Sequence, residues 1–138
     1  MRDYVKIIEE PVALSVPKRS VSILLKHGSI NGNLTGMFFS RNLYKRTGKF
    51  REDSWQVGDW EWIYRVARET PIVLSKHPIA VIRQHDLQLS GVYFINIRNS
   101  LEVIWMVKLL LNDPLLIDMP LAQHWATHRM QYHLWFAL

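Results

Sequence analysis

The stretch Gly58-Asp59-Trp60-Glu61-Trp62-Ile63-Tyr64-Arg65 has the pattern of an amphipathic helix with an acidic residue at its N-terminal end. We expect Asp59 to cap this helix, which should run to about Glu69 because Pro71 blocks its continuation. Apolar side chains recur within it at the spacing of a buried stripe. The helix dipole and the free amide groups of the first turn favour the ionised form of a carboxylate at this position.

The segments on either side predict short strands as well as helices. Upstream, the pattern predicts a strand over 4–8, a helix over 18–27, a turn over 31–33, a buried strand over 35–39, a brief helix over 41–46 and a charged loop over 49–57. Downstream it predicts strands over 72–74 and 79–82 and helices over 93–111 and 121–138, with Asp113-Pro114 as a helix-start signal between them. The expected fold class is mixed α/β, with a partial sheet and flanking helices in residues 1–92 and a helical extension in residues 93–138.

Composition limits the class of protein. The 138 residues are 49% hydrophobic, which allows one domain with a core, and the net charge of +5 indicates attraction to an anionic partner. The absence of cysteine excludes a disulfide scaffold and thiolate zinc sites. The start of the chain is charged and Lys108 interrupts the longest apolar run, so we expect no export signal and no transmembrane segment. The expected location is the cytoplasm, with peripheral contact to a membrane as an open alternative.

Four segments then follow one another in a recognisable order: Gly36-Met37-Phe38-Phe39-Ser40-Arg41, Gly48-Lys49-Phe50-Arg51-Glu52, the helix start at 58–67, and Arg83-Gln84-His85 through Ser90. Together they resemble the C-terminal, acceptor-side half of a family 2 glycosyltransferase of the GT-A fold. In that family an apolar strand leads to an arginine-bearing turn, a G-x-F loop follows, and an acidic pair at a helix start supplies the catalytic base. The resemblance covers residues 28–91 and makes the expected sheet a partial GT-A-like sheet.

The resemblance implies an inverting transfer from a nucleotide-sugar donor to a sugar or lipid-linked hydroxyl acceptor, as in cell-surface polysaccharide biosynthesis. It makes Asp59 the base that takes the proton of the acceptor hydroxyl, while Gly58 stands where the family usually has glutamate. His85 matches a histidine near the donor diphosphate or its metal, a magnesium or manganese ion. Arg83 would share its side of the strand and reach the same anion. On position alone, a helix cap is the better explanation for Asp59, and the family pattern is what favours the base.

Two parts of a complete enzyme of this kind are missing from the sequence. No Asp-x-Asp motif occurs, although the family uses one to hold the divalent cation that bridges the donor phosphates. The upstream strand-helix repeat that binds the nucleoside is also absent. The Gln-x-x-Arg-Trp motif of processive synthases has no match at Arg83-Gln84-His85-Asp86, which favours a single-transfer enzyme. The chain therefore resembles half of an active site.

Candidate acceptor contacts surround the helix start. Arg41 and Arg51 belong to the only basic cluster recognised in the sequence. An arginine there can hold a phosphate by two parallel hydrogen bonds, although a solvated surface is the better account for most of the cluster. Trp60 is the better candidate for an exposed platform on which a sugar stacks, whereas Trp62 has the spacing of a core residue. We do not expect nucleic acid binding, because no basic surface with interleaved aromatic residues is recognisable.

Three histidines mark the C-terminal segment, and His124 and His128 would share a helix face. A catalytic zinc site is not expected, because Trp125 occupies the place of the glutamate that such a site uses as its base. Trp125, Met130, Leu134 and Trp135 offer an apolar side instead. An amphipathic helix that packs on a partner or lies at a membrane surface accounts better for this segment, which includes His133.

A second function stays open beside the transferase. A truncated relative could keep part of the fold without catalysis and serve as a protein-interaction module. A partial sheet without its neighbouring strands exposes an edge and an apolar surface, which favours a partner chain or self-association.

Overall fold

The computed structural model describes residues 12–30, 34–75, 77 and 97–137. Its elements are β1 (Val12–Leu14), α2 (Pro17–His27), the 3-10 helix η1 (Leu34–Gly36), α3 (Arg41–Thr47), α4 (Gly58–Glu69), β2 (Ile72–Leu74), α6 (Ile97–Leu111), the 3-10 helix η2 (Pro114–Leu116) and α7 (Pro120–Ala137). The described part is mixed, as predicted, but mostly helical. Its sheet has only two antiparallel strands, in which Val12 pairs with Leu74 and Leu14 pairs with Ile72.

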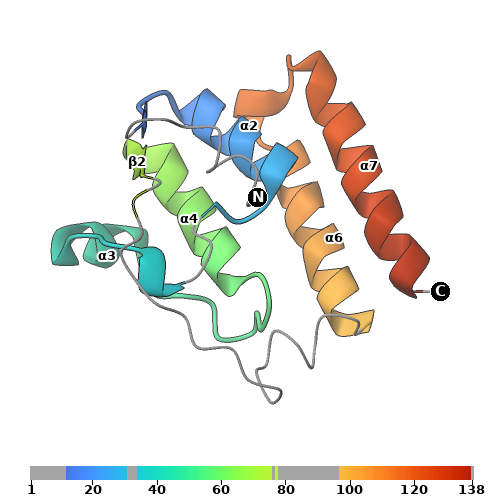
Figure 1. The fold of residues 1–138 in the computed structure, drawn as a ribbon, viewed down its shortest axis with the longest axis horizontal. Coiled ribbons are helices and arrows are strands. Elements are labelled where there is room, and N and C mark those ends of the chain that lie inside the picture. Colours follow the sequence, from blue (N-terminus) through green and yellow to red (C-terminus); the bar gives the residue numbers. More distant parts are fainter. Residues whose placement is uncertain (1–11, 31–33, 76, 78–96, 138) are drawn as a thin grey trace.

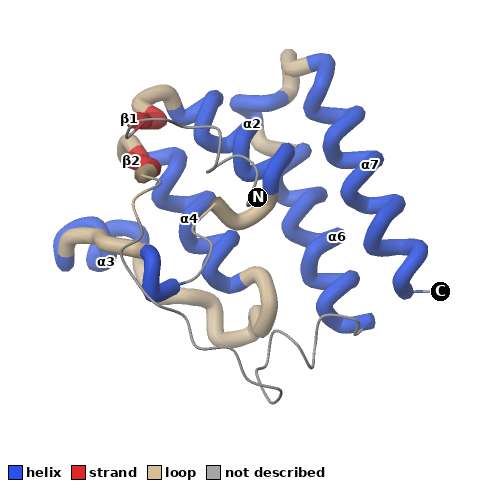
Figure 2. The backbone as a smooth tube through the Cα atoms, in the orientation of Figure 1, coloured by secondary structure: helices blue, strands red, loops and turns tan. Residues whose placement is uncertain are grey.

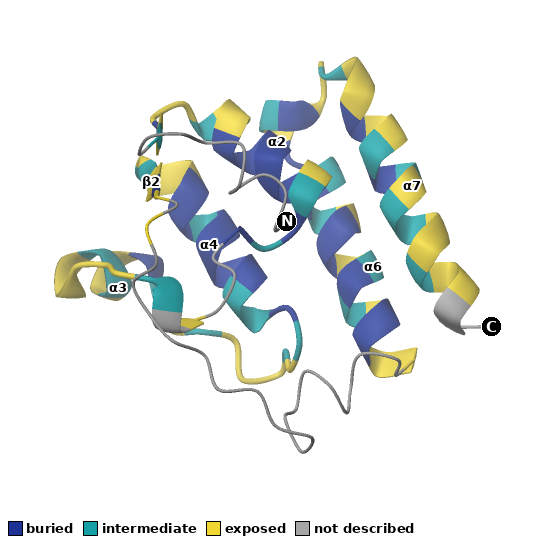
Figure 3. Cartoon of the chain, in the orientation of Figure 1, coloured by how far each residue is buried: buried dark blue, intermediate teal, exposed yellow. Residues whose placement is uncertain are grey.

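Helix α2 lies at the centre of the fold. It sits between α4 on one side and the antiparallel pair of α6 and α7 on the other (Figures 1 and 2). Its middle is buried on nearly all sides, from Ser20 to Leu25, because it contacts α4, α6, α7 and η2. The core follows these contacts, so that buried residues line the facing sides of the helices (Figure 3).

Local signals account for the predicted ends of two helices. Pro17 begins α2, and the helix stops at Gly28, whose φ of 82° lies in the left-handed region that favours glycine. The Ser40 side chain accepts a 3.1 Å hydrogen bond from the Leu43 N–H and so caps α3, which ends at Gly48 with a φ of 83°. The predicted loop over 49–57 and the strand over 72–74 are also confirmed.

The strand predicted over 35–39 is wrong. Leu34–Gly36 forms a turn of 3-10 helix, and residues 37–40 have no regular structure. A buried strand needs a neighbour to pair its backbone groups, and within the described ranges the only strand pairing joins β1 to β2. The side chain of Phe38 is instead 83% exposed.

The apolar side predicted for the C-terminal helix faces the core only in part. Trp125 and Met130 pack partly buried against the core, beside Ala122 and Ala126, which are buried. Leu134 is exposed and Trp135 is 81% exposed, so these two residues do not face the core. In the described residues, no helix has the length and hydropathy needed to cross a membrane.

The strands predicted over 4–8 and 79–82, the turn over 31–33 and the first residues of the helix predicted from 93 lie outside the described residues. The described parts of the two C-terminal helices agree with the prediction, since α6 ends at Leu111 and α7 begins at Pro120. Asp113 is confirmed as a cap, because its carboxylate accepts a 2.8 Å hydrogen bond from the Leu115 N–H at the start of η2.

Candidate functional site

Asp59 lies in the first turn of α4 and is not the N-cap that the sequence predicts. The helix begins at Gly58 with Val57 as its N-cap, two positions before the predicted cap, because the Val57 carbonyl already accepts a 2.8 Å hydrogen bond from the Glu61 N–H. The Asp59 carboxylate accepts a 2.7 Å hydrogen bond from the adjacent Trp60 N–H and a 3.4 Å hydrogen bond from the Ser29 hydroxyl. Its position still lets the positive end of the helix dipole stabilise its negative charge.

The Asp59 side chain is partly exposed and lines an open pocket of about 400 Å³. We call this the Asp59 pocket; it is lined by Leu34, Phe50, Arg51, Ser54, Trp55, Gln56, Gly58 and Asp59. Most of its wall comes from the loop that joins α3 to α4. It therefore combines a carboxylate, polar side chains, a guanidinium and aromatic rings, which are the groups that proteins use to bind a polyhydroxylated ligand.

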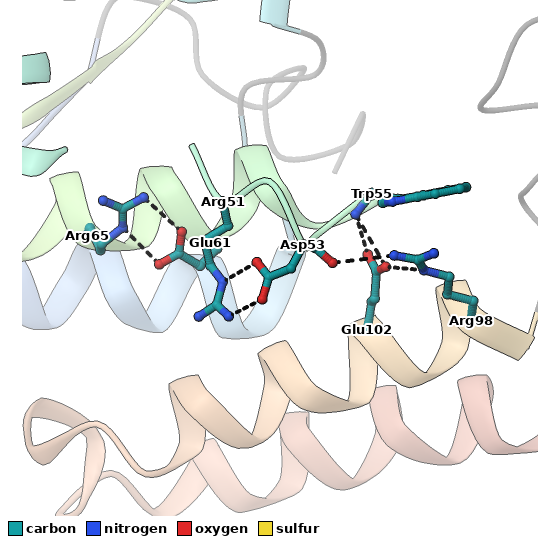
Figure 4. Close-up of polar contacts among 7 residues, drawn as sticks. All are labelled: Arg51, Asp53, Trp55, Glu61, Arg65, Arg98 and Glu102. Carbon is teal, nitrogen blue, oxygen red and sulfur yellow. Dashed lines mark hydrogen bonds and ion pairs between the residues drawn. The ribbon is translucent and has the colours of Figure 1, made fainter. Parts of the chain in front are cut away.

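The loop that forms the pocket wall is fixed from α6 (Figure 4). The Glu102 carboxylate accepts hydrogen bonds of 3.0 Å from the Trp55 N–H and 2.8 Å from the Gln56 N–H, and its ion pair with Arg98 measures 3.1 Å. Burial alone would raise the pKa of Glu102, but these two N–H groups and Arg98 outweigh it, so the pKa lies below its ordinary value. Glu102 therefore holds the loop as a carboxylate at neutral pH.

Trp55 is the exposed aromatic residue of the pocket. Its side chain is 61% exposed, and the Arg98 guanidinium stacks 3.9 Å from the ring centre. A cation over an aromatic face is attracted to the ring by about 0.5–1 kcal/mol at an exposed site, so this contact restrains Trp55. Sequence reasoning missed this residue, although a tryptophan inside a charged loop, away from any apolar periodicity, was the available signal.

Trp60 is not the exposed platform that the sequence predicts. It is only 4% exposed, and the Arg129 guanidinium of α7 covers its ring at 5.5 Å from the centre. On α4, Trp60 faces the helices that pack against its first turn. The local sequence pattern does not reveal this packing. Trp60 is therefore part of the core, and the sugar-stacking role predicted for it is better matched by Trp55.

The two arginines predicted as acceptor contacts differ in placement. Arg51 lines the Asp59 pocket, pairs with Asp53 at 2.6 Å and lies 5.0 Å from the centre of the Trp105 ring. Arg41 is exposed at the start of α3 and does not line this pocket. The structure thus brings Arg51, but not Arg41, together with Asp59.

Helix α4 is anchored to the chain before it by Arg65, which contacts Glu61 across one turn of the helix (Figure 4). The Arg65 Nε lies 2.8 Å from Glu61, and the guanidinium also donates to the carbonyls of Thr47 and Lys49. Glu61 is buried, so the pair does not lie on the helix surface. Through the two carbonyls, Arg65 joins α4 to the end of α3 and to the residue that follows Gly48. This contact fixes where the helix carrying Asp59 sits relative to the loop.

The residues predicted on the donor side, Arg83 and His85, lie outside the described residues. Within the described ranges, no group of three or more histidine and acidic side chains is placed to hold a metal ion. The described residues therefore supply no ligand set for the magnesium or manganese ion that the family resemblance implies.

A second, apolar pocket of about 290 Å³ lies between the segment after η1 and β2. Phe38, Phe39, Ile72 and Val73 are among its lining residues, and the side chains of Phe38 and Val73 are exposed. Deeper in this pocket Trp62 packs on Phe39, with 4.7 Å between ring centres, and donates a 2.8 Å hydrogen bond to the Gly48 carbonyl. The apolar surface predicted for a partial sheet is thus present around Phe38 and Val73.

Comparison with known proteins gives no assignment: no family model, no curated protein and no solved structure matches this chain.

Proposed function

We propose that this chain is the acceptor-side portion of an inverting, nucleotide-sugar-dependent glycosyltransferase with a partial GT-A-like fold. The observation that carries the proposal is that the Asp59 carboxylate and the exposed Trp55 ring line the same open pocket. The family resemblance of residues 28–91 supports the same role for Asp59.

In the proposed reaction, a hydroxyl group of the acceptor sugar sits against Asp59. The carboxylate takes the hydroxyl proton as the oxygen attacks the anomeric carbon of the donor from the side opposite the diphosphate. The bond between the anomeric carbon and the diphosphate oxygen breaks, and nucleoside diphosphate leaves with the electron pair. Trp55 offers an aromatic face to the acceptor ring, and Arg51 offers a guanidinium to a phosphate or hydroxyl group on it.

On the donor side, the proposal assigns Arg83 and His85 to the diphosphate of the nucleotide sugar. A magnesium or manganese ion would neutralise the leaving diphosphate, but the described residues supply no ligand set for it. The Asp-x-Asp motif and the nucleoside-binding unit would have to come from chain or partner outside these 138 residues.

The test is transfer by the native protein, purified from its own cells with any chain that accompanies it. It would be incubated with a panel of nucleotide sugars, monosaccharide and lipid-linked acceptors, and magnesium or manganese. We expect release of nucleoside diphosphate that depends on an acceptor, and a product with inverted anomeric configuration. Release at the same rate without any acceptor, a retained configuration, or no release with any donor would contradict the proposal.

A second candidate function rests on the apolar surface around Phe38 and Val73. These side chains are 83% and 67% exposed and line the same apolar pocket, which suits a partner chain or a second copy. If the chain is an interaction module, light scattering after size exclusion should detect a complex. Phe38→Ser should disrupt this complex. Ile117→Ser, at another exposed apolar position, should leave it intact. A complex without sugar transfer would favour the module over the transferase.

A further inference from the structure

A pocket of about 440 Å³ lies between the C-terminal end of α2 and helix α7. Five of its seven lining residues are basic: Lys26, His124, His128, Arg129 and His133. The other two are Trp125 and Tyr132, and no acidic residue lines it. It shares no residue with the Asp59 pocket, so an inference about it stands apart from the proposed function.

The two permanent cations of this pocket are held in place by its aromatic and backbone groups. The Lys26 ammonium lies 5.4 Å from the centre of the Trp125 ring. The Arg129 guanidinium donates a 2.7 Å hydrogen bond to the Lys26 carbonyl. Within the described residues, no carboxylate lies within ion-pair distance of either side chain. The positive charge of the pocket is therefore not neutralised by these contacts.

This charge favours an anion and disfavours a metal ion. His124 and His128 are one turn apart on α7, a spacing that suits zinc, but the neighbouring Lys26 and Arg129 would repel a divalent cation. The absence of a suitable ligand group among the described residues agrees with this. Imidazolium, ammonium and guanidinium groups are all hydrogen-bond donors to a phosphate oxygen.

We propose that the pocket between α2 and α7 binds a phosphate group, with Lys26, His128 and Arg129 as its principal contacts. The phosphate belongs to a free phosphorylated ligand or to a lipid headgroup, since both present the same oxygens. The volume of the pocket accommodates the phosphate group together with part of the molecule that carries it, which would lie against Trp125 and Tyr132.

Binding should strengthen as the pH falls. Burial and the charge of Arg129 lower the pKa of His133, and burial, Lys26 and Arg129 lower the pKa of His27. The charged and titratable groups around the pocket are Lys26 and His27 from α2, and His124, His128, Arg129, Tyr132 and His133 from α7. A bound phosphate anion offsets the repulsion among the positive groups and so raises the pKa of His133 toward its ordinary value of 6.5.

The test follows the imidazole signals of the whole chain by NMR while inorganic phosphate, pyrophosphate, or vesicles of phosphatidylcholine with or without phosphatidylglycerol are added. Lys26→Gln and His128→Gln, both at exposed positions, would each weaken binding by about threefold or more. Lys108→Gln, which removes an exposed lysine of α6 outside the pocket, would leave binding unchanged.

Each arm gives a decisive result. A raised His133 pKa with free phosphate or pyrophosphate supports a soluble ligand. The same change only with phosphatidylglycerol vesicles supports a headgroup, provided that Lys26→Gln and His128→Gln weaken it. The proposal is overturned if no addition shifts the His133 signal, or if both variants bind as tightly as the parent.

Discussion

The Glu102 carboxylate on α6 accepts a 2.8 Å hydrogen bond from the Gln56 N–H, so a helix 46 positions downstream fixes the wall of the Asp59 pocket. The adjacent Trp55 N–H donates to the same carboxylate. This contact links the helical C-terminal part of the chain to the candidate site. Helix α6 is therefore part of the scaffold of the site.

Replacing Glu102 with glutamine tests this link. Glu102→Gln keeps the shape but removes the charge, and we expect the free energy of unfolding to fall by about 1–2 kcal/mol. Glu52→Gln, at an exposed position of the same loop, is the matched control and should change it by less than about 0.5 kcal/mol. Chemical denaturation at neutral pH measures both. Equal stabilities of the two variants would show that Glu102 does not hold the loop.

The same pair predicts a pH dependence. Because folding lowers the pKa of Glu102 below its reference value of 4.5, its stabilisation is fully present above that pH and is lost as the pH falls through the folded pKa. The difference in stability between parent and Glu102→Gln should therefore shrink below pH 4.5. A difference that stays constant through this range would contradict the assignment.

Trp55 is expected to contribute to acceptor binding more than to the chemical step. Trp55→Ala removes the aromatic face, and the KM for the acceptor should rise by about 3- to 10-fold with little change in kcat. Trp135→Ala is the control, since that tryptophan is even more exposed but lies on α7. Steady-state kinetics with varied acceptor separates the two parameters. An unchanged KM in Trp55→Ala would remove Trp55 from the site.

The buried pair of Tyr64 and Asp113 predicts an unusual alkaline titration. The Tyr64 hydroxyl donates a 2.7 Å hydrogen bond to Asp113, and burial together with that carboxylate raises the pKa of Tyr64 to about 12. The stabilisation from this pair is thus present below pH 10 and is lost as the pH rises toward 12. Absorbance titration of the parent minus Tyr64→Phe should show this late step. A Tyr64 transition near pH 10 would contradict the pairing.

Gly28 is expected to resist substitution because of both its backbone and its surroundings. Its φ is +82°, and an added Cβ would lie 3.0 Å from a terminal nitrogen of Arg129. Gly28→Ala should therefore destabilise the fold by about 1–2 kcal/mol. Gly58→Ala is the contrast, because its Cβ would meet no atom closer than 3.7 Å. Thermal unfolding should show a lower midpoint only for Gly28→Ala, and equal midpoints would refute the argument.

Local sequence signals predicted where the helices end better than they predicted how the helices pack on one another. Pro17, Gly28, Ser40 and Gly48 act within one or two turns of the chain, so the ends of α2 and α3 were readable from the sequence. The fate of Trp60 was not, because its burial depends on Arg129, which lies 69 positions away on α7. A helix pattern states that one face is buried but does not say which other helix covers its first turn.

The candidate site was predictable in part for the same reason. The sequence singled out Asp59 and Arg51, whose roles follow from their place in the loop and at the helix start. Trp55 was missed, because its position depends on the contacts of Glu102 and Arg98 with the loop, across a long separation in sequence. The prediction of a strand over 35–39 was wrong because an apolar run does not by itself provide a neighbouring strand to pair with.

The most direct test of the central claim is the rate of sugar transfer by Asp59→Asn at saturating donor and acceptor. The native protein would be compared with this variant and with Asp118→Asn, which removes an exposed carboxylate between η2 and α7. Loss of the general base predicts a fall in kcat of about 10²-fold or more for Asp59→Asn, with an unchanged acceptor affinity and full activity in Asp118→Asn. A kcat for Asp59→Asn equal to that of the parent would contradict the claim that Asp59 is the base.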